Sequence, residues 1–281
     1  MGKQKTHVPL GRETLRRSMM KLKVLRADPA GNITLFVLDP VGKAQRGKLA
    51  ERLMALSRFQ AEQVGYVCET ADGTDGHMEM AGGEFCGNAT RAFGMLMAKR
   101  KGLHGRCRLT LEVSGCEKNV GVEVDLDNGT ARAEMPLPLF ARKETVGGVS
   151  GTLVHLGGIA HFIVEDVEPS IAFFLAAEPM FFALEGLDAY GVMFHDSKTH
   201  RMTPLVKVPA ANSLVWEGSC GSGSLASAIA QSEGMSDGEF ERDYIQPAGT
   251  VRATAVRKGG EVVAAYIGGS VTLDEPVEVE I

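Results

Sequence analysis

The feature that most constrains this chain is a short motif that occurs twice, each time directly before a segment with helical periodicity. The first copy covers residues 84–90 (EFCGNAT) and the second covers residues 218–224 (GSCGSGS). Each contains a cysteine, a glycine, a residue that commonly caps helices, a small residue and a hydroxyl-bearing residue. The repetition predicts two related halves that carry a cysteine at equivalent positions.

The residues after each motif predict a helix. After the first copy, apolar residues recur with the i, i+3, i+4, i+7, i+8 spacing of an amphipathic helix: Ala89, Ala92, Phe93, Leu96 and Met97. After the second copy, Leu225, Ala228 and Ile229 follow a shorter version of this spacing. Gly102 and Gly234 then act as stop signals, because a left-handed glycine commonly closes a helix. We therefore expect each cysteine just ahead of a helix.

A cysteine at a helix start has chemical consequences. The first turn presents unpaired N–H groups and partial positive charge, which lower the pKa of a nearby thiol and can hold a carboxylate. Two such sites suggest two thiols that face one ligand. Two alternatives stay open at this point: buried structural cysteines, since free cysteine is often buried, or a structural disulfide between Cys86 and Cys220.

Composition excludes several classes of protein. The 281 residues carry a net charge of −5 with dispersed basic residues, so we expect no nucleic-acid partner. The five cysteines are an odd number without metal-ligand spacing, which argues against a disulfide framework and against a metal site. No apolar stretch near the start is long enough for a signal peptide or a membrane span. We expect a cytoplasmic protein with no membrane partner.

The pattern along the chain predicts two lobes after a basic N-terminal extension, residues 1–21, that we expect to be disordered. Strands dominate, with helices at 43–57 and 171–177 and a hairpin turn at 127–129. In the helix at 43–57 the inward residues are expected to be Leu49, Leu53, Met54 and Leu56. The order of elements in the two halves is alike. The expected fold is α/β (α+β), with two pseudo-symmetric lobes, each a curved, mostly antiparallel sheet around a central helix that begins at its cysteine.

Residues 86–88 and 220–223 resemble the two active-site motifs of the diaminopimelate epimerase family of cofactor-independent amino-acid racemases. The resemblance covers most of the chain and includes Gly31-Asn32, Glu62-Gln63-Val64-Gly65, residues 157–161 (GGIAH) and residues 246–249 (QPAG). It implies a diaminopimelate epimerase-like fold and no cofactor. The N-terminal lobe would comprise residues 22–136, the C-terminal lobe residues 137–267, and residues 268–281 would return to the first lobe.

Within that family, residues 84–90, 113–116 and 214–223 look most like the histidine racemases of staphylopine-type metallophore synthesis. The epimerases grip the distal head of diaminopimelate with asparagines and an arginine. Here the matching places hold Ile159 or its neighbour, then Gly191, and the Ala211-Asn212 pair, so this clamp is missing. A second zwitterionic head would be costly to bury without polar partners. The expected activity is therefore conversion of L-histidine to D-histidine for metallophore synthesis.

Several alternatives stay open. In the same class, the chain could be a diaminopimelate epimerase or a racemase of another amino acid. From other classes, it could be a thiol-disulfide redox protein, although the close Cys-x-x-Cys spacing is absent, or a non-catalytic protein that binds a small acid. In each racemase interpretation the partner is a small-molecule amino acid. The oligomer we expect, where the chain forms one, is a homodimer.

The mechanism that the residues permit uses both cysteines as catalytic groups. Inverting an α-carbon needs a base on one face and an acid on the other, which Cys86 and Cys220 would supply. The charge that forms spreads into the α-carboxylate, where backbone amides can stabilise the transition state more than the ground state. The residues expected to bind substrate are Asn32, Gln63, Gly87, Asn88, Gly221 and Ser222.

Two further residues are expected to support the cysteines. The family pairs a histidine with a glutamate in this role. His161 matches the histidine, whereas Ala211 stands where the glutamate is expected. Glu217 is the candidate replacement from another direction. A lone histidine on a strand is, without the resemblance, more often structural than catalytic.

Overall fold

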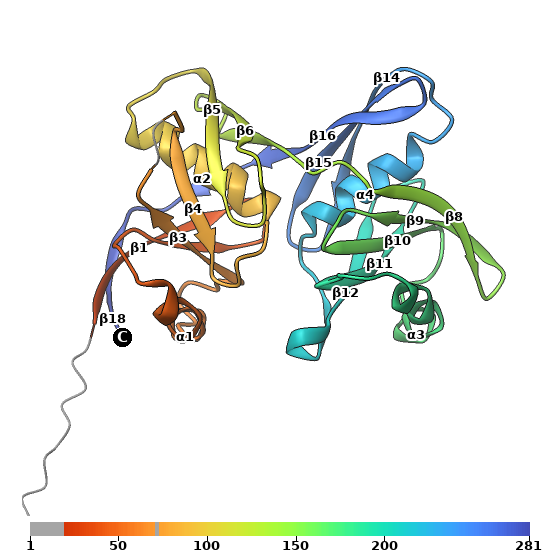
Figure 1. Ribbon diagram of the computed structural model, residues 1–281, viewed down its shortest axis with the longest axis horizontal. Coiled ribbons are helices and arrows are strands. Elements are labelled where there is room, and N and C mark those ends of the chain that lie inside the picture. The colour runs from red at the N-terminus through yellow and green to blue at the C-terminus, as the bar shows by residue number, and fades with distance from the viewer. Residues whose placement is uncertain (1–19, 71–72) are drawn as a thin grey trace, which may run out of the picture.

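The computed structural model describes residues 20–70 and 73–281 and consists of two lobes that lie side by side (Figure 1). The α-helices are α1 (Lys43–Met54), α2 (Gly87–Arg100), α3 (Ile171–Ala177) and α4 (Gly221–Gln231), and the 3₁₀ helices are η1 (Glu178–Ala183) and η2 (Pro209–Ala211). The residues 1–19, most of the expected extension, lie outside the described residues. Lys21, its last residue, already belongs to the first strand, where it pairs with Glu280.

The larger sheet has twelve strands, and it runs through both lobes. In chain order its strands are β1 (Lys21–Asp28), β2 (Thr34–Val37), β3 (Gln63–Cys68), β4 (Gly76–Met80), β5 (Arg106–Val113), β6 (Val120–Asp125), β7 (Thr130–Glu134), β14 (Gly238–Ile245), β15 (Thr250–Lys258), β16 (Glu261–Ser270), β17 (Thr272–Leu273) and β18 (Val277–Glu280). Antiparallel pairing of β16 with β7 makes the sheet continuous. Each lobe was expected to have a separate sheet. Instead one sheet crosses between the lobes, because β16 pairs with β15 on one edge and with β7 on the other.

The smaller sheet has six strands in the order β13-β12-β11-β10-β9-β8. They are β8 (Phe140–Val146), β9 (Val149–His155), β10 (Ile159–Glu165), β11 (Ala189–His195), β12 (Met202–Val208) and β13 (Ser213–Trp216). Helix α4 packs between this sheet and β14–β16 through a shared apolar core, whereas α2 packs in the other lobe. Each lobe is thus mostly antiparallel strands around one buried helix.

The two buried helices begin at the cysteines, as the motif predicted. Cys86 and Cys220 are the N-cap residues of α2 and α4, with extended backbones at φ −129° and −115°. The expected capping residues, Asn88 and Ser222, instead lie inside the first turns. The reason at α2 is that the Cys86 sulfur itself accepts the N–H of Ala89 at 3.4 Å.

Helix α3 and one hairpin match the sequence predictions, whereas helix α1 differs from its prediction. Helix α3 has the predicted bounds, and β6 and β7 form the predicted hairpin. Helix α1 ends at Met54, and Met54 is 38% exposed, so its inward placement was wrong. Met54 follows the buried Leu53 directly, and consecutive helical residues point about 100° apart. None of the helices in the described part of the chain is long and apolar enough to span a bilayer.

The last strand and two loops join distant parts of the chain. Strand β18 pairs with β1, so the end of the chain returns to the first lobe's sheet. At the other end of β1, the loop that follows this strand packs on residues 246–249. A Cβ on Gly31 would lie 2.4 Å from that of Ala248, and a Cβ on Gly249 would lie 2.3 Å from the Ala30 carbonyl oxygen. These contacts hold the loop that carries Asn32 against the segment next to Cys220.

The contact between these loops predicts a large effect of one methyl group. Gly249→Ala should destabilise the protein by about 1–3 kcal/mol, because the new Cβ meets backbone atoms that cannot rotate away. Gly47→Ala is the matched control, since Gly47 lies in α1 with open space around it, and should stabilise by about 0.5–1 kcal/mol. Urea unfolding measures both. Equal stability of Gly249→Ala and the native chain would contradict the close packing.

Candidate active site

The starts of the two buried helices meet at one side chain, Ile267 in the middle of β16. A Cβ built on Gly87 would lie 2.7 Å from Ile267 Cδ1, and a Cβ built on Gly221 would lie 2.7 Å from the same atom. The Gly221 position is also 3.4 Å from Asn88 Oδ1. A side chain at either place would displace the end of Ile267 and, at Gly87, also Met135, whose Sδ would lie 2.5 Å away, so a glycine after each cysteine lets the two helix starts come together without moving these side chains.

Amide side chains surround Cys86. Its thiol donates to Asn32 Oδ1 at 3.8 Å, and the same oxygen accepts from Gln63 Nε2 at 2.9 Å and from Asn88 Nδ2 at 3.3 Å. The structure therefore brings together three of the residues predicted to bind substrate. Burial raises the pKa of the Cys86 thiol, and the N–H of Ala89 and the Gln63 amide oppose this only in part. The net lowering of this pKa that was expected from the helix start was therefore wrong.

Cys220 lies deeper and has partners of a different kind. Its backbone N–H donates to Gln246 Oε1 at 2.6 Å, and its sulfur lies 3.6 Å from Ser222 Oγ. Glu217, three residues before Cys220, interacts with this thiol electrostatically. Burial raises the pKa of the Cys220 thiol well above its usual value, and the charge of Glu217 raises it further.

The two residues expected to support the cysteines both lie on the Cys220 side. His161 is fully buried, and its Nε2 lies 2.8 Å from Ser222 Oγ, so it connects to Cys220 through that hydroxyl. Burial lowers the pKa of His161 to about 3, so its ring is neutral at physiological pH. Its Nδ1 has no hydrogen-bond partner within the described part of the chain. Glu217, by contrast, acts on Cys220 through its charge.

Sequence reasoning missed three residues of this region. Gln246 holds the Cys220 backbone and also donates to Ser224 Oγ at 2.9 Å. Glu62 accepts from Asn32 Nδ2 at 2.7 Å. Burial raises the pKa of Glu217, and the charge of Glu62 raises it further. Arg91 is fully buried below Asn88. Gln246 and Glu62 lie in the short motifs that carried the family resemblance, which was the available signal, but no role had been attached to them.

Glu62 and Glu217 come from different lobes and lie close enough for the charge of Glu62 to act on Glu217. A Cβ on Gly218 would lie 3.8 Å from Glu62 Oε1, which places Glu62 beside the segment that leads to Cys220. Neither Glu62 nor Glu217 forms an ion pair with a basic residue in residues 20–70 and 73–281.

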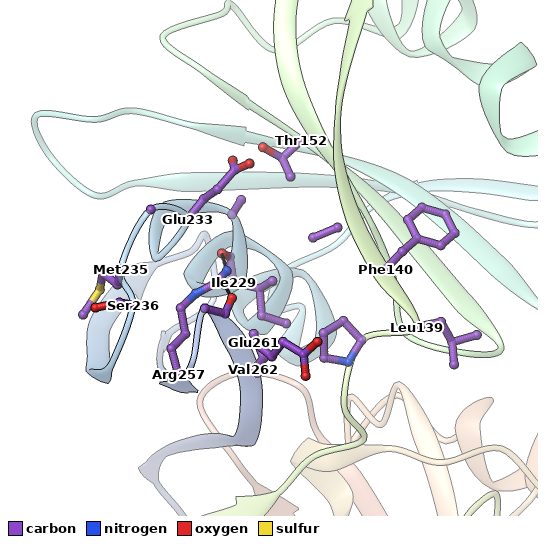
Figure 2. Close-up of a pocket in the computed structure, with 15 residues that line it drawn as sticks. Leu139, Phe140, Thr152, Ile229, Glu233, Met235, Ser236, Arg257, Glu261 and Val262 are labelled. Atoms are coloured by element: carbon purple, nitrogen blue, oxygen red, sulfur yellow. Dashed lines mark hydrogen bonds between the residues drawn. The ribbon is translucent and has the colours of Figure 1, made fainter.

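A cavity of about 670 Å³ lies near the C-terminal end of α4 (Figure 2), and none of the predicted site residues lines it. Its Arg257 donates to the Ile229 carbonyl and to Ser232 Oγ, so it caps the helix end. All five cysteines are free thiols, so Cys86 and Cys220 form no disulfide here. Among the described residues, no three histidine, cysteine or acidic side chains are grouped as metal ligands.

Solved structures with the same fold include several racemases and epimerases. A predicted epimerase from Pseudomonas aeruginosa superposes with a TM-score of 0.65 at 12% identity, covering 92% of this chain and 99% of that one. A hydroxyproline epimerase from Agrobacterium vitis with bound trans-4-hydroxy-L-proline gives a TM-score of 0.62 at 11% identity, covering 93% of each chain. At this identity the likeness concerns the fold alone.

Sequence comparison is more specific. A histidine racemase from Fusobacterium nucleatum is 34% identical over 219 residues, which is 75% of this chain and 80% of that protein. A histidine racemase from Staphylococcus aureus is 26% identical over 242 residues, covering 82% and 87%. The family model described as the histidine racemase CntK N-terminal domain matches residues 21–275. This chain therefore belongs to the histidine racemase family.

Proposed function

We propose that this protein interconverts L-histidine and D-histidine, with Cys86 and Cys220 as the two groups that move the α-proton. The observation that carries the proposal is the meeting of the two cysteine-capped helix starts at Ile267. A base and an acid on opposite faces of one carbon are what inversion requires. The relatedness to histidine racemases supports the substrate.

The reaction uses groups that the two helix starts present. The substrate carboxylate binds the N–H groups at Gly87, Asn88, Gly221 and Ser222, where two helix dipoles favour negative charge. A thiolate on one side takes the α-proton, and the electron pair left on the α-carbon spreads into the carboxylate. The thiol on the other side then gives its proton to the opposite face. The amide N–H groups stabilise this transition state because its carboxylate carries more charge than in the ground state.

Glu62 and Glu217 favour histidine over a substrate that carries a second carboxylate. The α-ammonium and the imidazole N–H of histidine both need acceptors once they leave water. Glu217, beside Cys220, suits the ammonium near the α-carbon, and the more exposed Glu62 suits the imidazole. The distal head of diaminopimelate carries a carboxylate beside its ammonium, and that carboxylate would meet like charge, which costs affinity.

The product and the thiols suggest a cellular setting. D-histidine would be supplied to metallophore synthesis, the use that the sequence resemblance indicates. Free thiols persist in reducing compartments, which fits a cytoplasmic enzyme. The two thiols provide both proton-transfer groups, so the chemistry is complete without pyridoxal phosphate.

Replacing either cysteine should separate exchange from inversion. Cys86→Ala and Cys220→Ala should each lower racemisation of histidine at least about a thousandfold, since each face loses its only proton-transfer group. Each variant should still exchange the α-hydrogen of one enantiomer with deuterated water, and the two variants should prefer opposite enantiomers. Proton NMR measures exchange, and chiral chromatography measures inversion.

The control for these variants is Cys107→Ala, because Cys107 is a half-buried thiol on β5 that should leave the rate unchanged. If either active-site variant racemised histidine at the native rate, the two-thiol mechanism would be wrong. If native protein inverted diaminopimelate and left histidine untouched, the mechanism would stand and the substrate assignment would fall.

Glu62→Gln should weaken histidine binding with little change in turnover. The substitution removes the charge but keeps the shape and the acceptor oxygen for Asn32. A hydrogen bond to a charged group contributes about 1.5–3 kcal/mol, so the KM for histidine should rise roughly tenfold or more. Steady-state kinetics beside Glu51→Gln, an exposed residue of α1, gives the comparison. An unchanged KM would remove Glu62 from substrate recognition.

A further inference from the structure

We propose that Gln246 is a positioning residue for Cys220, and that its side-chain amide keeps this cysteine where it can exchange a proton with the substrate. The proposal rests on the two-thiol racemisation proposed above and deepens it, because it names a group that acts on one face of the reaction. Gln246 is 5% exposed and hydrogen-bonds to the Cys220 backbone rather than to the sulfur. Hydrogen bonds and close packing around one tight turn, residues 246–249, carry the argument.

The Gln246 amide holds both polar groups of the Cys220 backbone. The Cys220 N–H donates to Gln246 Oε1 at 2.6 Å, and Gln246 Nε2 donates to the Cys220 carbonyl at 3.4 Å. The same nitrogen donates to Ser224 Oγ at 2.9 Å, and that hydroxyl donates to the Cys220 carbonyl at 2.8 Å. Because a peptide N–H can only donate, Oε1 must face it, and this fixes the orientation of the amide.

The same turn holds the segment that leads into Cys220. Residues 217–220 connect β13 to α4, and within them the Gly218 carbonyl accepts the N–H of Ala248 at 2.8 Å. The turn itself is closed by the N–H of Gln246, which donates to the Gly249 carbonyl at 2.8 Å, between strands β14 and β15. Two of the three residues directly before α4 are therefore tied to a turn that belongs to the larger sheet.

Cys86 is held in a different way. Its sulfur accepts the N–H of Ala89 at 3.4 Å and donates to Asn32 Oδ1 at 3.8 Å. The Cys220 side chain, by contrast, makes no capping hydrogen bond to its helix. Among residues 20–70 and 73–281, no side-chain amide hydrogen-bonds to the Cys86 backbone. Loss of the Gln246 amide should therefore disturb one cysteine and leave the other in place.

The other face of the turn packs against the first lobe. The methyl group of Ala248 lies between two glycines, one from each lobe: a Cβ on Gly31 would collide with it, and a Cβ on Gly218 would lie 2.9 Å from it. Asn32, which contacts the other active-site sulfur, follows Gly31 directly. The turn that holds the Cys220 backbone is thus packed against the loop of the opposite half of the site.

The placement of Cys220 matters because proton transfer is sensitive to distance. A reacting group that is misplaced by about 1 Å can lose on the order of a hundredfold in rate. Without the Gln246 amide, the Cys220 N–H would be buried without its acceptor, and the backbone would move to find another. Since Cys220 serves one face of the α-carbon, the loss should appear at that face alone.

The test measures each face separately, in full-length proteins that keep one active-site cysteine. Gln246→Met, which removes the amide and keeps a long flexible side chain, is added to Cys86→Ala and to Cys220→Ala. Proton NMR follows exchange of the α-hydrogen of L-histidine and of D-histidine with deuterated water. Exchange should fall at least about tenfold where Cys220 is the remaining thiol, and change less than about twofold where Cys86 remains.

Gln231→Met is the matched control. It makes the same substitution at the opposite end of α4, where the Gln231 amide donates to Glu165 at 2.7 Å and accepts from Tyr244 at 2.8 Å. It should leave exchange unchanged in both single-cysteine proteins. Equal falls in both proteins with Gln246→Met, or no fall where Cys220 remains, would overturn the proposal.

Ser224→Ala is the second variant, and it decides if circular dichroism shows Gln246→Met unfolded. It removes only the hydroxyl that links Gln246 Nε2 to the Cys220 carbonyl. Exchange should fall severalfold where Cys220 remains and stay unchanged where Cys86 remains. Equal effects in the two proteins would overturn the proposal.

A failure of the proposed function would look different. If neither single-cysteine protein exchanged the α-hydrogen of histidine, the racemase mechanism would fall, and thiol alkylation would decide the role of Gln246. Iodoacetamide labelling of the folded protein, followed by peptide mass spectrometry, gives a rate for each thiol. Gln246→Met should raise the rate at Cys220 severalfold and leave the rate at Cys86 unchanged. An unchanged rate at Cys220 would show that the amide does not hold this cysteine in place.

Discussion

The meeting of two helix starts at Ile267 is the contact on which the rest of the site depends. A methyl group on Gly87 or Gly221 would meet the end of the Ile267 side chain, which would have to shift. Because each glycine follows an N-cap cysteine, the same packing brings the two N-cap residues and the two helix N-termini to one side chain. The pairing of β16 with β7 fixes Ile267 between the lobes, so backbone hydrogen bonds determine the geometry of the chemistry.

A duplicated frame carries two unlike halves of a site. Both lobes supply a cysteine, a glycine and a helix, yet the side chains around the sulfurs differ in kind. Neutral amide side chains surround Cys86, whereas Glu217 and a hydroxyl linked to a neutral histidine lie beside Cys220. A racemase binds both mirror-image forms of its substrate, but in each turnover one cysteine must be protonated and the other deprotonated. Symmetric geometry with asymmetric charge meets both needs.

Local signals predicted the helices well, since capping, periodicity and stop residues act within about four turns. The start of α2, the start of α4 and the whole of α3 were recovered in this way. Features made by distant segments were not predictable from pattern. The β7–β16 pairing, the bond from Cys220 to Gln246 and the place of Glu62 beside Gly218 each join segments from different parts of the chain. No local periodicity encodes such pairings.

The missed pKa direction follows from comparing two magnitudes. A helix N-terminus stabilises a nearby anion by about 0.3–1 kcal/mol, which is less than one pKa unit. Full burial of a thiol can raise its pKa by several units. Burial therefore dominates at both cysteines. A thiolate formed against that cost is a stronger base than an exposed one, and the α-hydrogen of an amino acid is a weak acid. Burial therefore lowers the fraction of each cysteine that is ionised, but it makes the thiolate that does form a stronger base toward the α-hydrogen of the substrate.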